Sequence, residues 1–125
     1  MIATLKQYAI NKNFIEIKPA DNGSAKLSVE VNTKINPPKS KEDNKTAHFK
    51  LDVNIRSIEN EMIAISLEMN CLFEFDAPPK EYNDKVSQEC ASVALPELSA
   101  VLDGTLQLMK YPPIELWKNL EPQNQ

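Results

Sequence analysis

The stretch that decides the fold is Glu61–Asp76, which reads EMIAISLEMNCLFEFD. Every second residue in it is apolar, and this set comprises Ile63, Ile65, Leu67, Met69, Cys71, Phe73 and Phe75. Most residues between them are polar, among them Ser66, Glu68, Asn70 and Glu74. Such alternation is typical of a β-strand with one face on a core and the other towards water. A strand of this length spans about 50 Å and needs long partners.

Three earlier segments show the same alternation and are predicted to be those partners. Ser24–Asn36 and Lys45–Ile58 are regular, and Asn22-Gly23 before them is a strong turn signal. Leu5–Lys18 is only weakly patterned, and we expect an edge strand that is broken in its middle. The four extended segments predict an antiparallel sheet over residues 1–79.

Parity constrains the connection between Lys45–Ile58 and the long strand. The apolar residues are odd-numbered in both segments, and directly opposed residues of an antiparallel hairpin share a face. The numbers of a pair must then sum to an even value, so the loop has an odd length. A three-residue loop, Ile58–Asn60, places Ile55 opposite Ile63. A two-residue turn would direct one apolar face into water unless a bulge reset the register.

Residues 80–110 change to a helical period. Apolar side chains cover about half of the circumference of Lys85–Lys110, whereas a helix on one sheet needs a stripe of about 100°. We therefore expect the helix to touch a second surface, most simply another subunit. Pro96 predicts a kink or a boundary in this helix. The side chains assigned to the oligomer interface are Leu95, Leu98, Leu102 and Met109.

A short apolar segment follows the helix. Pro112-Pro113 ends the helical pattern, and residues 111–125 are predicted to be a loop and a short polar tail. Apolar Ile114, Leu116 and Trp117 lie in this region. Two interpretations remain open: the segment docks on the core of its own chain, or it is a partly exposed contact surface.

Composition bounds the class of protein. A length of 125 residues indicates a single domain, 1–125, and 42% hydrophobic content is ordinary for a globular chain. A net charge of −4 argues against a nucleic-acid partner, which requires a basic face. No apolar run is long enough to insert into a membrane. The N-terminus lacks the basic and apolar regions of a signal peptide, so we expect a cytoplasmic protein.

The sequence offers no pattern for catalysis. The chain has two glycines, too few for a phosphate-binding loop, and no spacing typical of metal ligands. His48 lies on a polar strand face and is interpreted as a surface residue. Cys71 and Cys90 are predicted to be buried, reduced thiols. We expect no enzyme, no metal and no cofactor, and favour a binding role over a small-molecule or catalytic site.

The order of these elements resembles that of the SecB-like family of export chaperones. Four extended segments precede Cys90–Leu98, with Pro96 in the first half of the helix, and then Leu108–Leu116, which contains an aromatic-Pro-x-apolar-x-apolar pattern. The resemblance covers Leu5–Leu116. It implies an α+β fold, a four-stranded antiparallel sheet followed by one long helix, in an oligomer that is a tetramer built as a dimer of dimers, or a dimer.

The resemblance also implies an activity and a site. SecB-like proteins hold non-native or precursor polypeptides in apolar grooves without ATP. The matching segment implies that Tyr111, Ile114 and Leu116 contact the client, and we add Trp117 because it follows them directly. The alternative is a dedicated chaperone for a single partner, such as an antitoxin, with no general export role.

One departure from the family concerns the C-terminus. Members that serve export carry a second, C-terminal helix as a lid, whereas here the chain ends a few residues after Trp117, so we expect little or none of that helix. This departure weighs against an export role, against docking to the export motor and against the tetramer. Carboxylates that could imitate the motor-binding surface are Glu68, Glu74 and Asp76.

Overall fold

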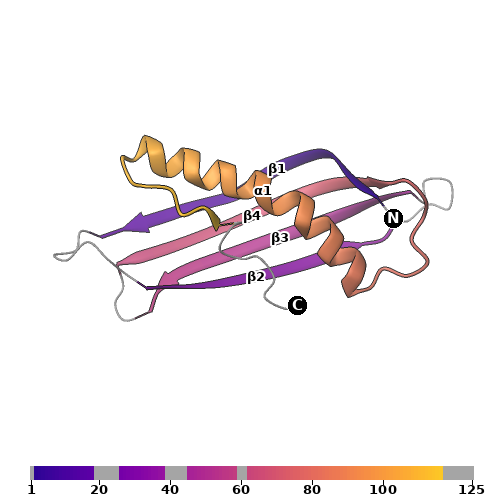
Figure 1. Ribbon diagram of the computed structural model, residues 1–125, viewed down its shortest axis with the longest axis horizontal. Coiled ribbons are helices and arrows are strands. Elements are labelled where there is room, and N and C mark those ends of the chain that lie inside the picture. Colours follow the sequence, from indigo (N-terminus) through magenta and orange to yellow (C-terminus); the bar gives the residue numbers. More distant parts are fainter. Residues whose placement is uncertain (1, 19–25, 39–44, 59–61, 117–125) are drawn as a thin grey trace.

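The computed structural model describes residues 2–18, 26–38, 45–58 and 62–116. It confirms the predicted fold class, four antiparallel strands followed by one long helix (Figure 1). The elements are β1 (Ala3–Ile17), β2 (Leu27–Asn36), β3 (Thr46–Ser57), β4 (Ile63–Phe75) and α1 (Asp84–Leu108). The turn at Asn22-Gly23 and residues 117–125 of the predicted tail lie outside the described residues.

The strand order in the sheet is β1-β4-β3-β2, and all neighbours are antiparallel. Strands β2, β3 and β4 follow one another as neighbours, whereas β1 lies on the far side of β4. The two edges are therefore β1, as predicted for that segment, and β2. Helix α1 crosses one face of the sheet obliquely, and no described element covers the other face (Figure 1).

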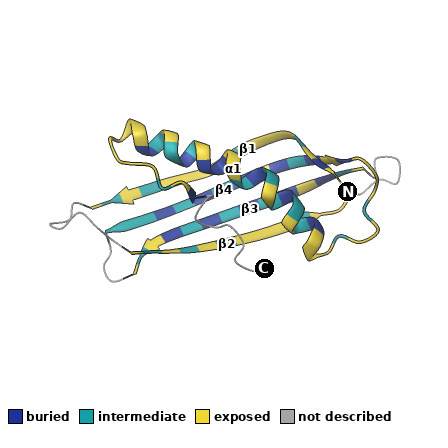
Figure 2. Cartoon of the chain, viewed as in Figure 1, coloured by how far each residue is buried: buried dark blue, intermediate teal, exposed yellow. Residues whose placement is uncertain are grey.

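The core lies between α1 and the two central strands. The buried side chains of β3 are Ala47, Phe49, Leu51, Val53 and Ile55, and those of β4 are Ile65, Leu67, Met69, Cys71, Phe73 and Phe75. Figure 2 shows the resulting alternation of buried and partly exposed residues along both strands. The rings of Phe49 and Phe73 meet edge to face with their centroids 5.7 Å apart. The period-2 pattern therefore marked the core face correctly.

The predicted register between β3 and β4 is wrong by two residues, although its parity is right. Ile55 lies opposite Ile65, not Ile63. The amide of Ile58 donates to the carbonyl of Lys26 at 2.9 Å, so this residue extends the pairing with β2 and does not enter a tight three-residue turn. A shift of two residues leaves every side chain on its own face, so burial cannot distinguish the two registers. Glu59 and Asn60 lie outside the described residues.

Strand β1 is continuous, and two irregularities replace the predicted break. The register shifts between Leu5 and Gln7 and again between Ile10 and Lys12. Each shift moves the core-facing residues from one parity to the other. Core-facing positions are thus odd at first, then even at Ile10, and odd again at Ile15, which lies opposite Ile65. The two β-bulges interrupt the alternation of apolar residues, and this explains the weak pattern of the segment.

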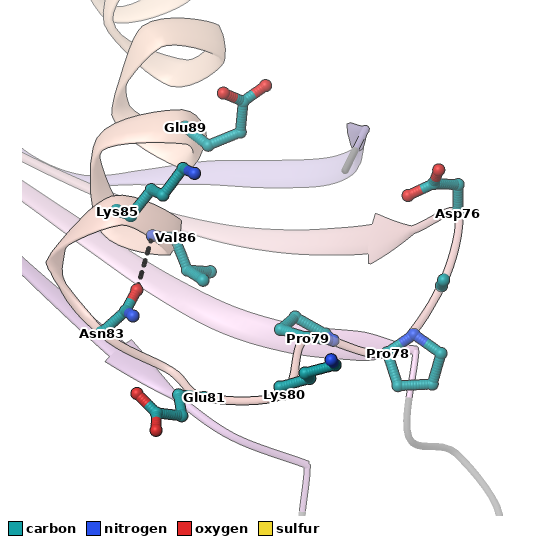
Figure 3. A pocket seen from close by; sticks show the side chains of 10 residues that line it. Asp76, Pro78, Pro79, Lys80, Glu81, Asn83, Lys85, Val86 and Glu89 are labelled. Atoms are coloured by element: carbon teal, nitrogen blue, oxygen red, sulfur yellow. Dashed lines mark hydrogen bonds between the residues drawn. The ribbon is translucent and has the colours of Figure 1, made fainter.

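Helix α1 begins at a capped N-terminus (Figure 3). The side-chain Oδ1 of Asn83 accepts a hydrogen bond of 3.3 Å from the amide of Val86, one of the donors that has no partner inside the helix. Just before the cap, the ring of Tyr82 packs edge to face on Phe75. The helix passes through Pro96 without ending there.

Replacing the cap tests its contribution to stability. We expect Asn83→Ala to lower the free energy of unfolding by about 1 kcal/mol, because the amide of Val86 loses its acceptor. Asn83→Asp retains an oxygen acceptor and is expected to remain within a few tenths of a kcal/mol of wild type. Urea unfolding followed by circular dichroism measures both, and equal losses in the two variants would contradict the capping role.

Candidate functional site

The C-terminal end of α1 is closed by a tight turn. The amide of Tyr111 donates to the carbonyl of Leu106 at 2.8 Å, and that of Lys110 donates to Gln107 at 3.0 Å. This pair of bonds is the Schellman arrangement, in which the residue after the cap adopts a left-handed conformation. Lys110 occupies that position with φ of 71°. The turn reverses the chain, and Pro112 then prevents any continuation of the helix.

The chain next runs back beside the helix, over the face of the sheet that α1 covers (Figure 1). We call this segment, Tyr111–Leu116, the strap. Asp103 of α1 anchors it, because its Oδ1 accepts hydrogen bonds from the amides of Ile114 at 2.9 Å and Glu115 at 3.3 Å. Glu115 has a positive φ of 53° between its two apolar neighbours.

The residues of the strap that were predicted to contact the client differ in their burial. Leu116 is 0% exposed and belongs to the hydrophobic core, and Ile114 packs against that core. Tyr111 remains 38% exposed. Trp117 lies outside the described residues. Ile114 and Leu116 therefore dock on the core of their own chain, which was the first interpretation. Tyr111 is partly exposed, as the second interpretation expected.

The residues assigned to the oligomer interface also divide into two groups. Leu98 and Leu102 are both 0% exposed within the single chain, because they face the sheet. Leu95 is partly buried and Met109 is exposed. The strap accounts for part of the wide apolar arc that suggested a second subunit, since Ile114 packs on the core from beside the helix. Leu95 and Met109 are the two members of the set that a neighbouring chain could reach.

Three exposed apolar side chains gather where the helix turns into the strap. Leu108 is 83% exposed, Met109 39% and Tyr111, which lies one residue beyond Lys110, 38%. We call this group the apolar rim. Scattered single apolar residues are normal on a surface, whereas three within four consecutive positions concentrate exposed apolar residues at this end of the helix. Met109 and Tyr111 were predicted site residues from the sequence, whereas Leu108 was predicted only as part of the apolar arc of the helix.

Asp103 is the residue that the sequence analysis missed. It lies on the polar side of the helical projection, where an exposed aspartate is ordinary, and no local motif marks it. Its two partners are eleven and twelve residues further along the chain. Only the reversal at Lys110 brings them together, so no pattern within the helix could identify this contact.

The carboxylates suggested as a motor-binding surface are partly engaged within the chain. Glu68 forms an ion pair with Lys50 at 3.2 Å, and this hydrogen bond raises the pKa of the Lys50 ammonium. Oδ1 of Asp76 accepts from the amide of Ile2 at 2.8 Å, which lowers the pKa of that carboxyl. Glu74 is exposed. The uncovered sheet face thus carries charges of both signs.

Both cysteines are buried, as predicted. Burial raises the pKa of the Cys71 thiol to about 11 and that of Cys90 to about 12. Thiols held neutral in this way are poor nucleophiles at neutral pH. Among the residues that the structure describes, no cluster of three or more His, Cys, Asp or Glu side chains could hold a metal ion.

Figure 3 shows a depression between the end of β4 and the start of α1. It is lined by residues of the connecting loop and the first turns of the helix. The carboxylates of Asp76, Glu81 and Glu89 lie far apart in it and do not converge on a common point. The arrangement offers no pair of groups for acid–base chemistry.

The solved structures that share this fold include the following two. A SecB-like chaperone from Mycobacterium tuberculosis, solved in complex with a ChAD peptide from an antitoxin, superposes with a TM-score of 0.72 and 10% identity, over 91% of this chain and 87% of that one. A protein of unknown function from Streptococcus agalactiae gives a TM-score of 0.54 and 12% identity, over 90% and 94% of the two chains. The chain therefore has a SecB-like fold.

Comparison of the sequence alone identifies no relative. No protein-family model matches the chain, and no curated protein is significantly similar to it. Among the described residues, no helix is long and apolar enough to span a membrane.

The conformation of Lys110 yields a test of the turn that positions the strap. We expect Lys110→Gly to raise the free energy of unfolding by about 1 kcal/mol, because glycine adopts a positive φ without the steric cost of a Cβ atom. Lys110→Ala removes the same charge but keeps the Cβ, and we expect little change. Thermal and urea unfolding of both variants measure the difference; a Gly variant no more stable than the Ala variant would refute this conformation.

Proposed function

We propose that this protein is a chaperone that holds non-native polypeptides without nucleotide. The observation that carries the proposal is the apolar rim of Leu108, Met109 and Tyr111, which lies beside a strap with further apolar residues. Unfolded clients present apolar side chains, and their burial is favourable at about 25 cal/mol per Å² whatever their order in the sequence. The likeness to a SecB-like chaperone that was solved with a bound peptide supports this proposal.

A dedicated client is the second candidate. The solved chaperone in the comparison holds a peptide from an antitoxin, which supports a polypeptide client and is compatible with a single partner. A dedicated chaperone would purify with one protein and would have little effect on the aggregation of unrelated clients. The rim is small, and this suits the recognition of one short segment.

Docking to an export motor has less support. Of the three carboxylates considered, Glu68 is paired with Lys50 and Asp76 accepts from the backbone amide of Ile2, while Glu74 and Asp76 are both exposed. We also propose that the protein is not an enzyme, since the carboxylates near the depression do not converge. The two buried, free thiols suit the reducing conditions of the cytoplasm.

The holding function predicts that the protein suppresses aggregation of an unfolded test protein at near-stoichiometric ratios without ATP. The variant Leu108→Ser with Tyr111→Ser removes two apolar side chains of the rim, so we expect it to lose most of this effect. Light scattering of a chemically unfolded test protein on dilution gives the measurement. A parallel search for one co-purifying protein separates the dedicated role from the general one.

A matched control is available on other parts of the surface. Ile2 and Ile58 are exposed apolar residues at 64% and 59%, outside the rim. Ile2→Ser with Ile58→Ser removes a similar apolar area, and we expect it to act as wild type does. Equal loss in both double variants would assign the effect to general surface hydrophobicity, and no suppression by the wild type would exclude general holding.

We further propose that the protein is a homo-oligomer, a dimer or a dimer of dimers. Of the accessible residues of the predicted interface, Met109 belongs to the apolar rim and Leu95 does not, so we expect Leu95→Lys to reduce the particle to the 14.1 kDa chain while it keeps its helical circular dichroism. Leu98→Lys should instead unfold the chain, because that side chain is in the core. Multi-angle light scattering measures the mass; a stable wild-type monomer at micromolar concentration would contradict this proposal.

A further inference from the structure

The strap already buries an apolar pair beside the rim. Ile114 and Leu116 both contact the core, and Glu115 between them is exposed. The segment therefore presents two apolar side chains, separated by one residue, to the surface formed by α1 and the sheet. An extended polypeptide also displays alternate side chains on one face, and the strap does so with a left-handed conformation at Glu115. The strap thus presents to the core the kind of apolar pair that a non-native client can offer.

The attachment of the strap is polar and accessible to water. Asp103 is only partly buried, and its carboxylate holds the amides of Ile114 and Glu115. Pro112 and Pro113, which precede these residues, have no amide hydrogen to donate. Because water can compete for a partly exposed carboxylate, these hydrogen bonds are weaker than buried ones would be.

The backbone at both ends of this attachment is strained. Lys110 and Glu115 are the non-glycine residues with positive φ in the described part of the chain; Lys110 precedes the attachment, and Glu115 is one of the two residues that Asp103 holds. A positive φ is costly for a residue with a Cβ atom, so release of the strap recovers part of that cost. Strain at a single functional segment is a common property of elements that move.

We propose that the strap is an intramolecular occupant of the client-binding surface, latched by Asp103 and displaced by the client. This inference rests on the proposed holding function. The client segment that replaces it carries two apolar side chains separated by one residue, which take the places of Ile114 and Leu116. Asp103 serves the latch and not the client, so it is a positioning residue. The apparent affinity for client is reduced by the fraction of molecules in which the strap is bound.

The latch is tested by Asp103→Ala against Asp103→Asn. Alanine removes the acceptor and favours the helix, whereas asparagine keeps an oxygen acceptor in the same place. We expect the amides of Ile114 and Glu115 to exchange with deuterium about tenfold faster in the Ala variant, and much closer to the wild-type rate in the Asn variant. NMR-detected exchange on the full chain resolves these two positions.

Client binding is measured on the same proteins. One probe is a fluorescent peptide with the strap sequence YPPIEL, and its matched control is YPPSES. The second probe is a chemically unfolded, carboxymethylated test protein. We expect both the YPPIEL peptide and the test protein to bind Asp103→Ala about three- to tenfold more tightly than wild type, and the serine peptide to bind neither. Leu116→Ala, which weakens the apolar anchor of the strap, should shift affinity in the same direction.

The outcomes distinguish three claims. The first is that Asp103 latches the strap, the second is that the bound strap competes with the client (the gating), and the third is the holding function. Unchanged exchange in Asp103→Ala overturns the latch. Faster exchange with unchanged client affinity overturns the gating and leaves the holding function intact. Failure of wild type and all variants to bind either probe, together with faster exchange in Asp103→Ala, overturns the holding function and the gating while the latch remains. Faster exchange together with tighter binding of both probes supports the inference.

Discussion

Burial of the alternate apolar residues of β3 and β4 beneath α1 is the interaction on which the rest of the structure depends. Residues such as Leu51, Met69 and Leu102 are fully buried at this contact, where the helix crosses both strands obliquely. The edge strands extend this surface, and the strap seals part of it beside the helix. The charged face on the other side follows from the same alternation, since every residue that leaves the core face points to water.

The regular strands could be predicted because burial on one face leaves a period of two in the sequence. That pattern also gave the correct parity of pairing between β3 and β4. It could not give the register, since a shift of two residues preserves every face. In the structure Ile58 donates to Lys26, the residue before β2, and does not enter a tight turn. In β1 the two bulges twice change the parity of the core-facing residues, which explains why the segment seemed broken.

The candidate site could be predicted less completely. The segment after the helix was identified from its apolar residues, but the pattern could not separate Tyr111, which is exposed, from Leu116, which is buried. In the same way, an apolar arc on a helix does not reveal what covers it. Leu98 and Leu102 face the chain's own sheet, and part of the remaining arc lies next to the strap. The distinction depends on the reversal at Lys110, where the chain direction is set by two backbone hydrogen bonds.

The sequence by itself determined the number and order of the elements, the face of each central strand that is buried, and the position of the helix end before Pro112. These properties are local, because each depends on periodicity or on a residue that restricts its own backbone. Only the tertiary structure decided the register, the bulges of β1, and the contact of Asp103 with the strap. Those features join residues that are distant along the chain or equivalent in polarity, and the free energy that selects among them comes from packing and hydrogen bonds that a linear pattern does not contain.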